Sequence, residues 1–201
     1  MERYLMTHSL LSSWLYAMKS SIYESERDPY EEFLKVLRRE PTETTDSMRN
    51  GLEFEDMVTK IANGECVDEE HKWYGAACKA ASYVCGGVDQ YKAKCEIKIS
   101  DLNILLYGRI DFLKAGTVID TKFSKSYERG KYFDSTQHPV YLRLIPDAEE
   151  FMYLISNGVD VWTEVYRRDE TQPIEPIIAD FFAFLSSNDL LDIYKKHWIA
   201  L

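Results

Sequence analysis

One stretch of sequence, residues 102–122, constrains the fold more than any other part of the chain. Two β-prone runs, 103–113 and 117–123, lie on either side of Lys114-Ala115-Gly116. A connection this short between two such runs is typical of a β-hairpin, whose strands are antiparallel. With Ala115-Gly116 as a two-residue turn, each residue faces the one at equal distance across the turn, so the turn fixes the register of the hairpin.

The predicted register gathers charged side chains. Asp111 faces Asp120 and Arg109 faces Lys122, and because alternate strand residues share a face, all four project the same way. Two carboxylates facing each other at about 5 Å repel at a cost on the order of a few kcal/mol near a protein surface. A divalent cation between the two carboxylates turns the net interaction from repulsive to attractive. Such hard oxygen ligands suit Mg²⁺ or Mn²⁺ better than zinc.

The rest of the chain predicts an α/β fold around this hairpin. With 201 residues and 45% hydrophobic content, the chain can bury one substantial core, which favours a single domain. The first amphipathic segment, residues 8–20, has no candidate catalytic or ligand-binding side chain, and we expect it to pack on the core. Helical spacing predicts helices at 8–20, 29–39, 47–63 and 69–84 and within 173–201, and alternation predicts strands at 91–99, 151–156 and 159–166.

Four short motifs occur in order over about ninety residues. They are Gly51-Leu-Glu-Phe-Glu55, Gly108-Arg-Ile-Asp111, Asp120-Thr-Lys122 and Gln137-His-Pro-Val-Tyr141. The last three resemble the GxxD, (D/E)xK and QxxxY motifs of the PD-(D/E)xK nucleases, in the branch of RecB-like exonucleases. The first looks like the helix of that branch that carries a residue close to the metal ion.

The resemblance implies a restriction-endonuclease-like fold, that is, a central mixed β-sheet flanked by helices. It implies one nuclease-like domain over residues 1–201, with N-terminal helices in 8–84, a catalytic core at about 47–167 and packing helices in 173–201. It also implies a Mg²⁺- or Mn²⁺-dependent deoxyribonuclease that hydrolyses phosphodiester bonds, an exonuclease of recombination or repair. Its partner would be DNA, with a protein partner or a homo-oligomer as further candidates.

Roles within the site follow from the same resemblance. Asp111 and Asp120 would be the main metal ligands, together with Glu55 and the carbonyl oxygen of Thr121, and Lys122 would act on the attacking water. On the predicted helix that begins near residue 135, Gln137 and Tyr141 share a face at the N-terminal end, where an anionic phosphate is favoured. Further contacts to DNA are expected from Arg109, Lys125, Arg129 and Lys131.

Other interpretations compete with this one. Gly86-Gly-Val-Asp89 and Glu96-Ile-Lys98 also fit GxxD and ExK, but no QxxxY follows them, and Glu96 and Lys98 fit the solvated face of an alternating strand. A non-catalytic nuclease-fold protein that binds nucleic acid or a protein partner is a second hypothesis. A sequence-specific restriction endonuclease is a third, which the QxxxY motif disfavours.

Composition narrows the possibilities further. The net charge of −10 counts against broad nonspecific attraction to nucleic acid. No apolar run approaches the length of a membrane span, and no signal peptide is recognisable, so we expect a cytoplasmic protein, and the resemblance implies a bacterial or viral source. The cysteines lack the spacing of a zinc site, an iron–sulfur site or a disulfide framework, and we expect buried, reduced thiols at Cys66, Cys78, Cys85 and Cys95.

Overall fold

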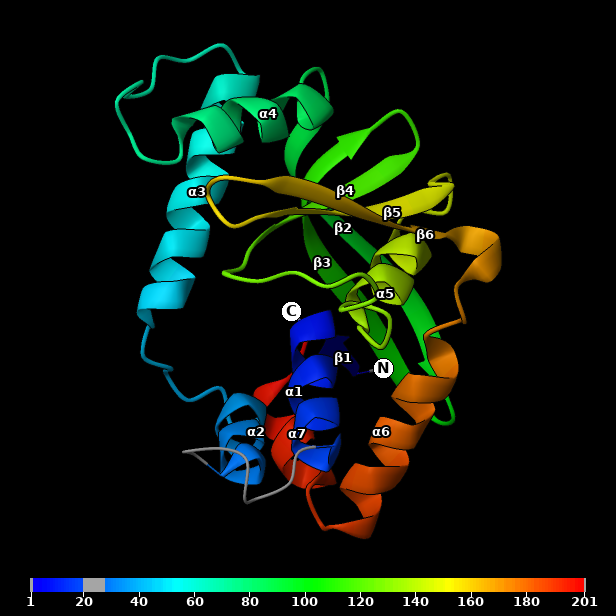
Figure 1. The fold of residues 1–201 in the computed structure, drawn as a ribbon. Helices are drawn as coiled ribbons and strands as arrows, with labels where there is room; N and C mark the ends of the chain where they lie inside the picture. Colours follow the sequence, from blue (N-terminus) through cyan, green and yellow to red (C-terminus); the bar gives the residue numbers. More distant parts are fainter. Residues whose placement is uncertain (1, 20–27, 201) are drawn as a thin grey trace.

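The computed structural model describes residues 2–19 and 28–200 and shows an α/β architecture, a mixed six-stranded sheet flanked by helices (Figure 1). Five strands follow the order β1-β3-β4-β5-β6, and β2 pairs with β3. The pairs β1–β3 and β4–β5 are parallel and the other pairs are antiparallel. The strands are β1 (Arg3–Met6), β2 (Val88–Ile99), β3 (Leu102–Lys114), β4 (Thr117–Phe123), β5 (Glu150–Ser156) and β6 (Val161–Arg167).

The helices lie on the two faces of the sheet. On one face, α3 (Asp46–Ala62) and α4 (Tyr74–Val84) pack against side chains such as Ile119 and Leu154. Their strand neighbours Val118 and Tyr153 belong to the larger core on the other face, as the alternation of a strand requires. That core is covered by α1 (His8–Lys19), α2 (Pro29–Leu37), α5 (Gln137–Leu144), α6 (Glu175–Ser187) and α7 (Leu191–His197).

The predicted hairpin and its register are confirmed at the turn. Ala115 and Gly116 both have positive φ, 47° and 82°, as the tightest two-residue hairpin turns require. Phe112 pairs with Ile119, in the predicted register. Within the described residues the ladder between β3 and β4 ends there, so the expected pairing of Asp111 with Asp120 is not made.

Two strands share one edge of β3. Strand β2 runs along the other edge for almost its full length. On the shared edge, β1 pairs with residues 103–106 and β4 pairs with residues 112–114. In the part of the chain that the structure describes, no strand pairs with residues 107–111 on this edge. Because β1 is parallel to β3 and β4 is antiparallel, both direct their carboxyl ends toward this gap.

Several sequence-based boundaries need correction. The four-residue strand β1 is not predicted by the sequence, because it is too short to show a periodicity. Helix α3 is capped by Thr45 rather than by Asp46 or Ser47, and α4 begins at Tyr74 rather than at Glu69. Strand β6 begins at Val161. The predicted end of the first helix, Ser20, lies outside the described residues.

The expectation for the cysteines is also wrong in part. All four thiols are free, but Cys66 and Cys85 are exposed and Cys78 and Cys95 are only partly buried. A Cβ on Gly51, inside α3, would meet nothing within 4 Å, so no close approach of other atoms explains this helical glycine. Among the described helices, none is both long and apolar enough to cross a membrane.

A glycine in the β5–β6 turn offers a test of the packing between α4 and the sheet. Gly158 has φ of +91°, and a Cβ on it would lie 2.4 Å from Cδ1 of Trp73. We expect Gly158→Ala to lower the free energy of unfolding by about 2 to 4 kcal/mol, because backbone strain and overpacking add. Chemical denaturation measures this loss.

The control is Gly64→Ala, because Gly64 has φ of +73° but open space around its Cβ. It should show the backbone cost alone, about 1 to 2 kcal/mol. Equal losses in the two variants would mean that the Trp73 ring moves aside without cost.

Candidate functional site

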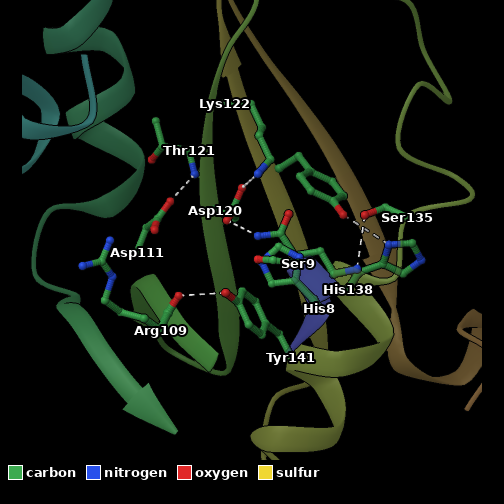
Figure 2. A network of polar contacts seen from close by, with 12 residues as sticks. His8, Ser9, Arg109, Asp111, Asp120, Thr121, Lys122, Ser135, His138 and Tyr141 are labelled. Carbon is green, nitrogen blue, oxygen red and sulfur yellow. Dashed lines mark hydrogen bonds and ion pairs between the residues drawn. The ribbon is translucent and has the colours of Figure 1, made fainter. Parts of the chain in front are cut away.

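A cavity of about 330 Å³ opens at the gap on the edge of β3. Five elements contribute side chains to it, namely β3, β4, α3, α5 and the start of α1. The chain enters α1 from β1 at the same place (Figure 2). The cavity is lined by Thr7, His8, Ser9, Glu55, Tyr107, Gly108, Arg109, Asp111, Asp120, Thr121, Lys122, Gln137 and Tyr141. The structure thus brings together residues from all four motifs and adds a group from the N-terminus.

Asp120 is held from two sides. Its side chain is buried, its Oδ1 accepts a hydrogen bond from the side-chain amide of Gln137, and its Oδ2 lies 2.7 Å from the Lys122 ammonium. Burial lowers the pKa of Lys122, but the negative charge and hydrogen bond of Asp120 outweigh that effect, and the pKa is raised. Lys122 is therefore a charged ammonium at neutral pH.

Asp111 fills the gap between the strands. Its Oδ2 accepts a hydrogen bond of 2.8 Å from the backbone N–H of Thr121, in place of a strand-to-strand bond. The N–H and C=O of one strand residue point to the same edge, so the carbonyl of Thr121 is directed toward Asp111 as well. The hydroxyl of Thr121 is buried and has no partner among the described residues.

Glu55 reaches the cavity from α3. Its carboxylate accepts a hydrogen bond of 2.9 Å from the side-chain amide of Gln90 on β2. Burial raises the pKa of Glu55, the bond from Gln90 lowers it, and the charge of Asp120 raises it again, with a net increase. No sequence pattern singles out Gln90, whose backbone has a positive φ of 48°.

These carboxylates form a donor set of the kind that a hard cation takes. Burial, followed by the negative charges of Asp120 and Glu55, raises the pKa of Asp111 well above its usual range. A divalent cation would relieve this repulsion, so the chemistry of the site fits Mg²⁺ or Mn²⁺. Over residues 2–19 and 28–200, however, no three acidic, histidine or cysteine side chains are gathered as ligands of one ion.

Tyr141 packs tightly against β3 at the same gap. Its hydroxyl donates a hydrogen bond of 2.8 Å to the carbonyl of Arg109, and its ring lies where a Cβ on Gly108 would be, at 2.3 Å. Gly108 is therefore required for the approach of α5 to the sheet. Gln137 and Tyr141 share a face, as predicted, but the hydrogen bonds described for both are made within the protein.

His8 is a further residue of the site that no sequence motif indicates. Its ring lies edge-on to Tyr141, with ring centroids 5.4 Å apart, and its Nδ1 is buried with no partner in the described residues. Burial lowers the pKa of His8 to about 4, so the ring is neutral. The first helix is thus part of the site, contrary to expectation. Only recognition of β1 in the sequence could have indicated His8, because β1 brings the start of α1 to the gap.

The expected DNA-binding residues are not all in one place. Arg109 lines the cavity and is exposed, but Lys125, Arg129 and Lys131 lie outside it, on the loop between β4 and α5. This loop is anchored by the buried Glu164 of β6. The carboxylate accepts hydrogen bonds from the hydroxyls of Tyr127 and Tyr166 and from the backbone N–H groups of Gly130 and Tyr132.

The rival motif lies on the surface. Glu96 forms an ion pair of 2.6 Å with Arg3, and Lys98 is exposed on the same strand. Neither lines the cavity. Their placement on the solvated face of β2 agrees with the prediction.

Comparisons with known proteins concern the fold alone. No protein-family model matches the chain, and no curated protein matches it. Among solved structures, the chain is similar to one described as "Crystal structure of SSO0001", with a TM-score of 0.52 and 14% sequence identity. The similarity covers 90% of this chain and 76% of that chain.

The raised pKa of Asp111 predicts a dependence of stability on pH. A carboxyl whose pKa in the folded state lies above its unfolded value of 3.8 stabilises the fold below that pH, and this contribution is lost as the pH rises through the folded pKa. We expect Asp111→Asn to stabilise the protein by at least about 1 kcal/mol at neutral pH with a chelator present, because the amide carries no charge to bury. Unfolding experiments from pH 4 to 7 measure the difference, which should vanish toward pH 4.

Asp101→Asn serves as the control, because Asp101 is exposed in the turn between β2 and β3. It should leave the pH dependence as in the wild type. If Asp111→Asn also leaves it unchanged, the carboxyl is not destabilised by its neighbours.

Proposed function

We propose that the protein is a Mg²⁺- or Mn²⁺-dependent deoxyribonuclease of the PD-(D/E)xK superfamily, of the RecB-like exonuclease type with a restriction-endonuclease-like fold. One observation carries the proposal: Asp111, Asp120 and Lys122, which come from two strands, line one cavity at a gap in the sheet. Gln137 and Tyr141, from the last of the four motifs, line the same cavity. A purely structural role gives no reason to bury several carboxylates around a single lysine.

Asp111, Asp120, Glu55 and the carbonyl of Thr121 would hold the cation. When bound, it would lower the pKa of a water molecule and offset charge that develops on the scissile phosphate. Gln90 and Gln137 now donate to Glu55 and Asp120, so each amide would have to release or share its carboxylate oxygen. Each is a hydrogen bond from a neutral amide to a carboxylate, which contributes about 1.5 to 3 kcal/mol net, and binding of the cation would have to offset its loss.

Lys122 acts as a charged hydrogen-bond donor in this proposal. Its raised pKa disfavours a neutral amine, and hence a role as the base that takes a proton from water. An ammonium beside Asp120 can orient the attacking water and stabilise negative charge on the phosphate in the transition state. Arg109, exposed at the mouth of the cavity, supplies a second positive charge for the strand.

The second candidate is a non-catalytic nuclease-fold protein that binds nucleic acid or a protein partner. Two observations favour it: the net charge of −10, and the absence, within the described ranges, of three ligands already gathered around one ion. The same cavity would then bind without cleaving. A cleavage assay separates the two candidates.

The test replaces one carboxylate and the lysine of the site. We expect purified wild-type protein to degrade linear DNA when Mg²⁺ or Mn²⁺ is present and to lose this activity with a chelator. Asp120→Asn and Lys122→Ala should each lower the rate at least about 100-fold, because each removes a group that acts on the reacting atoms. Release of acid-soluble nucleotides measures the rate, and circular DNA as a second substrate separates exonuclease from endonuclease.

Lys98→Ala is the matched control, because Lys98 belongs to the rival ExK sequence and is exposed on β2. It should cleave as the wild type does. Wild-type protein that is folded, binds DNA and leaves it intact with either metal would support the non-catalytic candidate instead.

A further inference from the structure

The first turn of α1 faces the cavity with free backbone donors. Thr7 caps the helix, since its Oγ1 accepts from the N–H of Leu10 at 3.3 Å and its carbonyl accepts from the N–H of Leu11 at 3.4 Å. The N–H groups of His8 and Ser9 have no hydrogen-bond partner among the described residues. Thr7, His8 and Ser9 all line the cavity, so these donors lie at its wall.

The other helix that begins at the site, α5, offers fewer free donors to the cavity. In α5, the N–H of Gln137 donates to Oγ of Ser135 at 3.2 Å, and the N–H of Val140 donates to the carbonyl of Thr136 at 3.1 Å. Pro139 has no N–H to offer. The N–H of His138 has no hydrogen-bond partner among the described residues either, but His138 does not line the cavity. The sequence favours a phosphate at the N-terminus of α5, whereas the free donors at the cavity are those of α1.

The α1 terminus is held rigidly in this position. The hydroxyl of Thr136, at the start of α5, donates to the carbonyl of His8 at 3.2 Å and lies 2.8 Å from Oγ of Ser12. The two helix N-termini are therefore tied to each other. Donors fixed in this way lose little entropy when a ligand binds.

The side chain of His8 provides independent support for a ligand. Its Nδ1 is buried and unpartnered within the described residues, and its Nε2 lies 3.4 Å from Oγ of Ser9. An unsatisfied buried polar atom is costly, and sites that bind ligands are where such atoms are retained. The ring lies edge-on to Tyr141, and both side chains line the cavity together with Asp120 (Figure 2).

We propose that the first turn of α1, with the N–H groups of His8 and Ser9 and their side chains, is a phosphate subsite next to the carboxylates. Free N–H groups and the positive end of the helix dipole favour an anion there. The ligand is a phosphate group of the bound strand, either a terminal phosphomonoester or a phosphodiester beside the scissile bond. The identity of the strand rests on the proposed nuclease function, whereas the affinity for phosphate does not.

The sharpest variant removes a single backbone donor. Proline is well tolerated at the first position of a helix, where its N–H is not needed by the helix, so His8→Pro deletes this donor with little effect on α1. His8→Ala is the matched control, because it also removes the imidazole but keeps the N–H. Thermal unfolding should give similar midpoints for the two variants.

Binding is measured with fluorescent single-stranded oligonucleotides in a chelator, so that no cleavage occurs. The three probes carry a 5′-phosphate, a 3′-phosphate or no terminal phosphate. We expect His8→Pro to bind about tenfold more weakly than His8→Ala, as for one hydrogen bond to a charged group. A loss confined to one phosphorylated probe identifies a terminal phosphate, and an equal loss for all three identifies an internal phosphodiester.

Equal affinities of the two variants for every probe would overturn the subsite. Should His8→Pro fail to fold, the wild-type protein titrated with inorganic phosphate gives the answer by NMR. The amide signals of His8 and Ser9 should then shift more than those of Gln137 and Val140, and unchanged signals would also overturn the proposal. If the protein proves not to cleave DNA but these phosphate effects are present, the subsite stands and the nuclease function fails.

Discussion

The shared edge of β3 is the constraint on which the site depends. Strands β1 and β4 reach this edge from opposite directions and leave residues 107–111 unpaired there. Backbone groups inside a sheet need partners, and here side chains provide them. The Tyr141 hydroxyl donates a hydrogen bond to the carbonyl of Arg109, and the Asp111 carboxylate accepts one from the N–H of Thr121. The interactions that complete the sheet therefore also position the candidate catalytic groups, which is why the cavity lies at this point and not at an outer edge.

The electrostatics of the gap work against the stability of the fold. Asp111 and Glu55 both have a raised pKa, with burial as the largest cause in each case, and Lys122 is the one cation bonded directly to the cluster in the described part of the chain. Such strain is common where a site must remain ready for a charged ligand. The apolar cores on the two faces of the sheet must supply the stability that the cluster removes.

The sequence predicts what is local and misses what depends on distant pairing. The hairpin turn, the register next to it, the placement of Lys122 beside Asp120 and the shared face of Gln137 and Tyr141 all follow from spacings of a few residues. The pairing of Asp111 with Asp120 is expected from the same register but, within the described residues, is not made. Strand β1 could not be found, because four residues show no periodicity and its partner residues, 103–106, lie about a hundred positions away. His8 escapes notice for the same reason, since only the pairing of β1 brings the start of α1 to the gap.

The side-chain amides of Gln90 and Gln137 explain why the carboxylates of the site suit a cation although, within the described residues, no three ligands are gathered around one point. Gln137 and Gln90 each donate to a carboxylate from a different element, α5 and β2, and so hold Asp120 and Glu55 in separate contacts. A neutral amide satisfies a buried carboxylate without cancelling its charge, so the repulsion within the cluster persists. A bound cation would replace two hydrogen bonds from neutral donors by charge neutralisation at several oxygens. In the proposed function, relief of the repulsion between these carboxylates would favour binding of the cation.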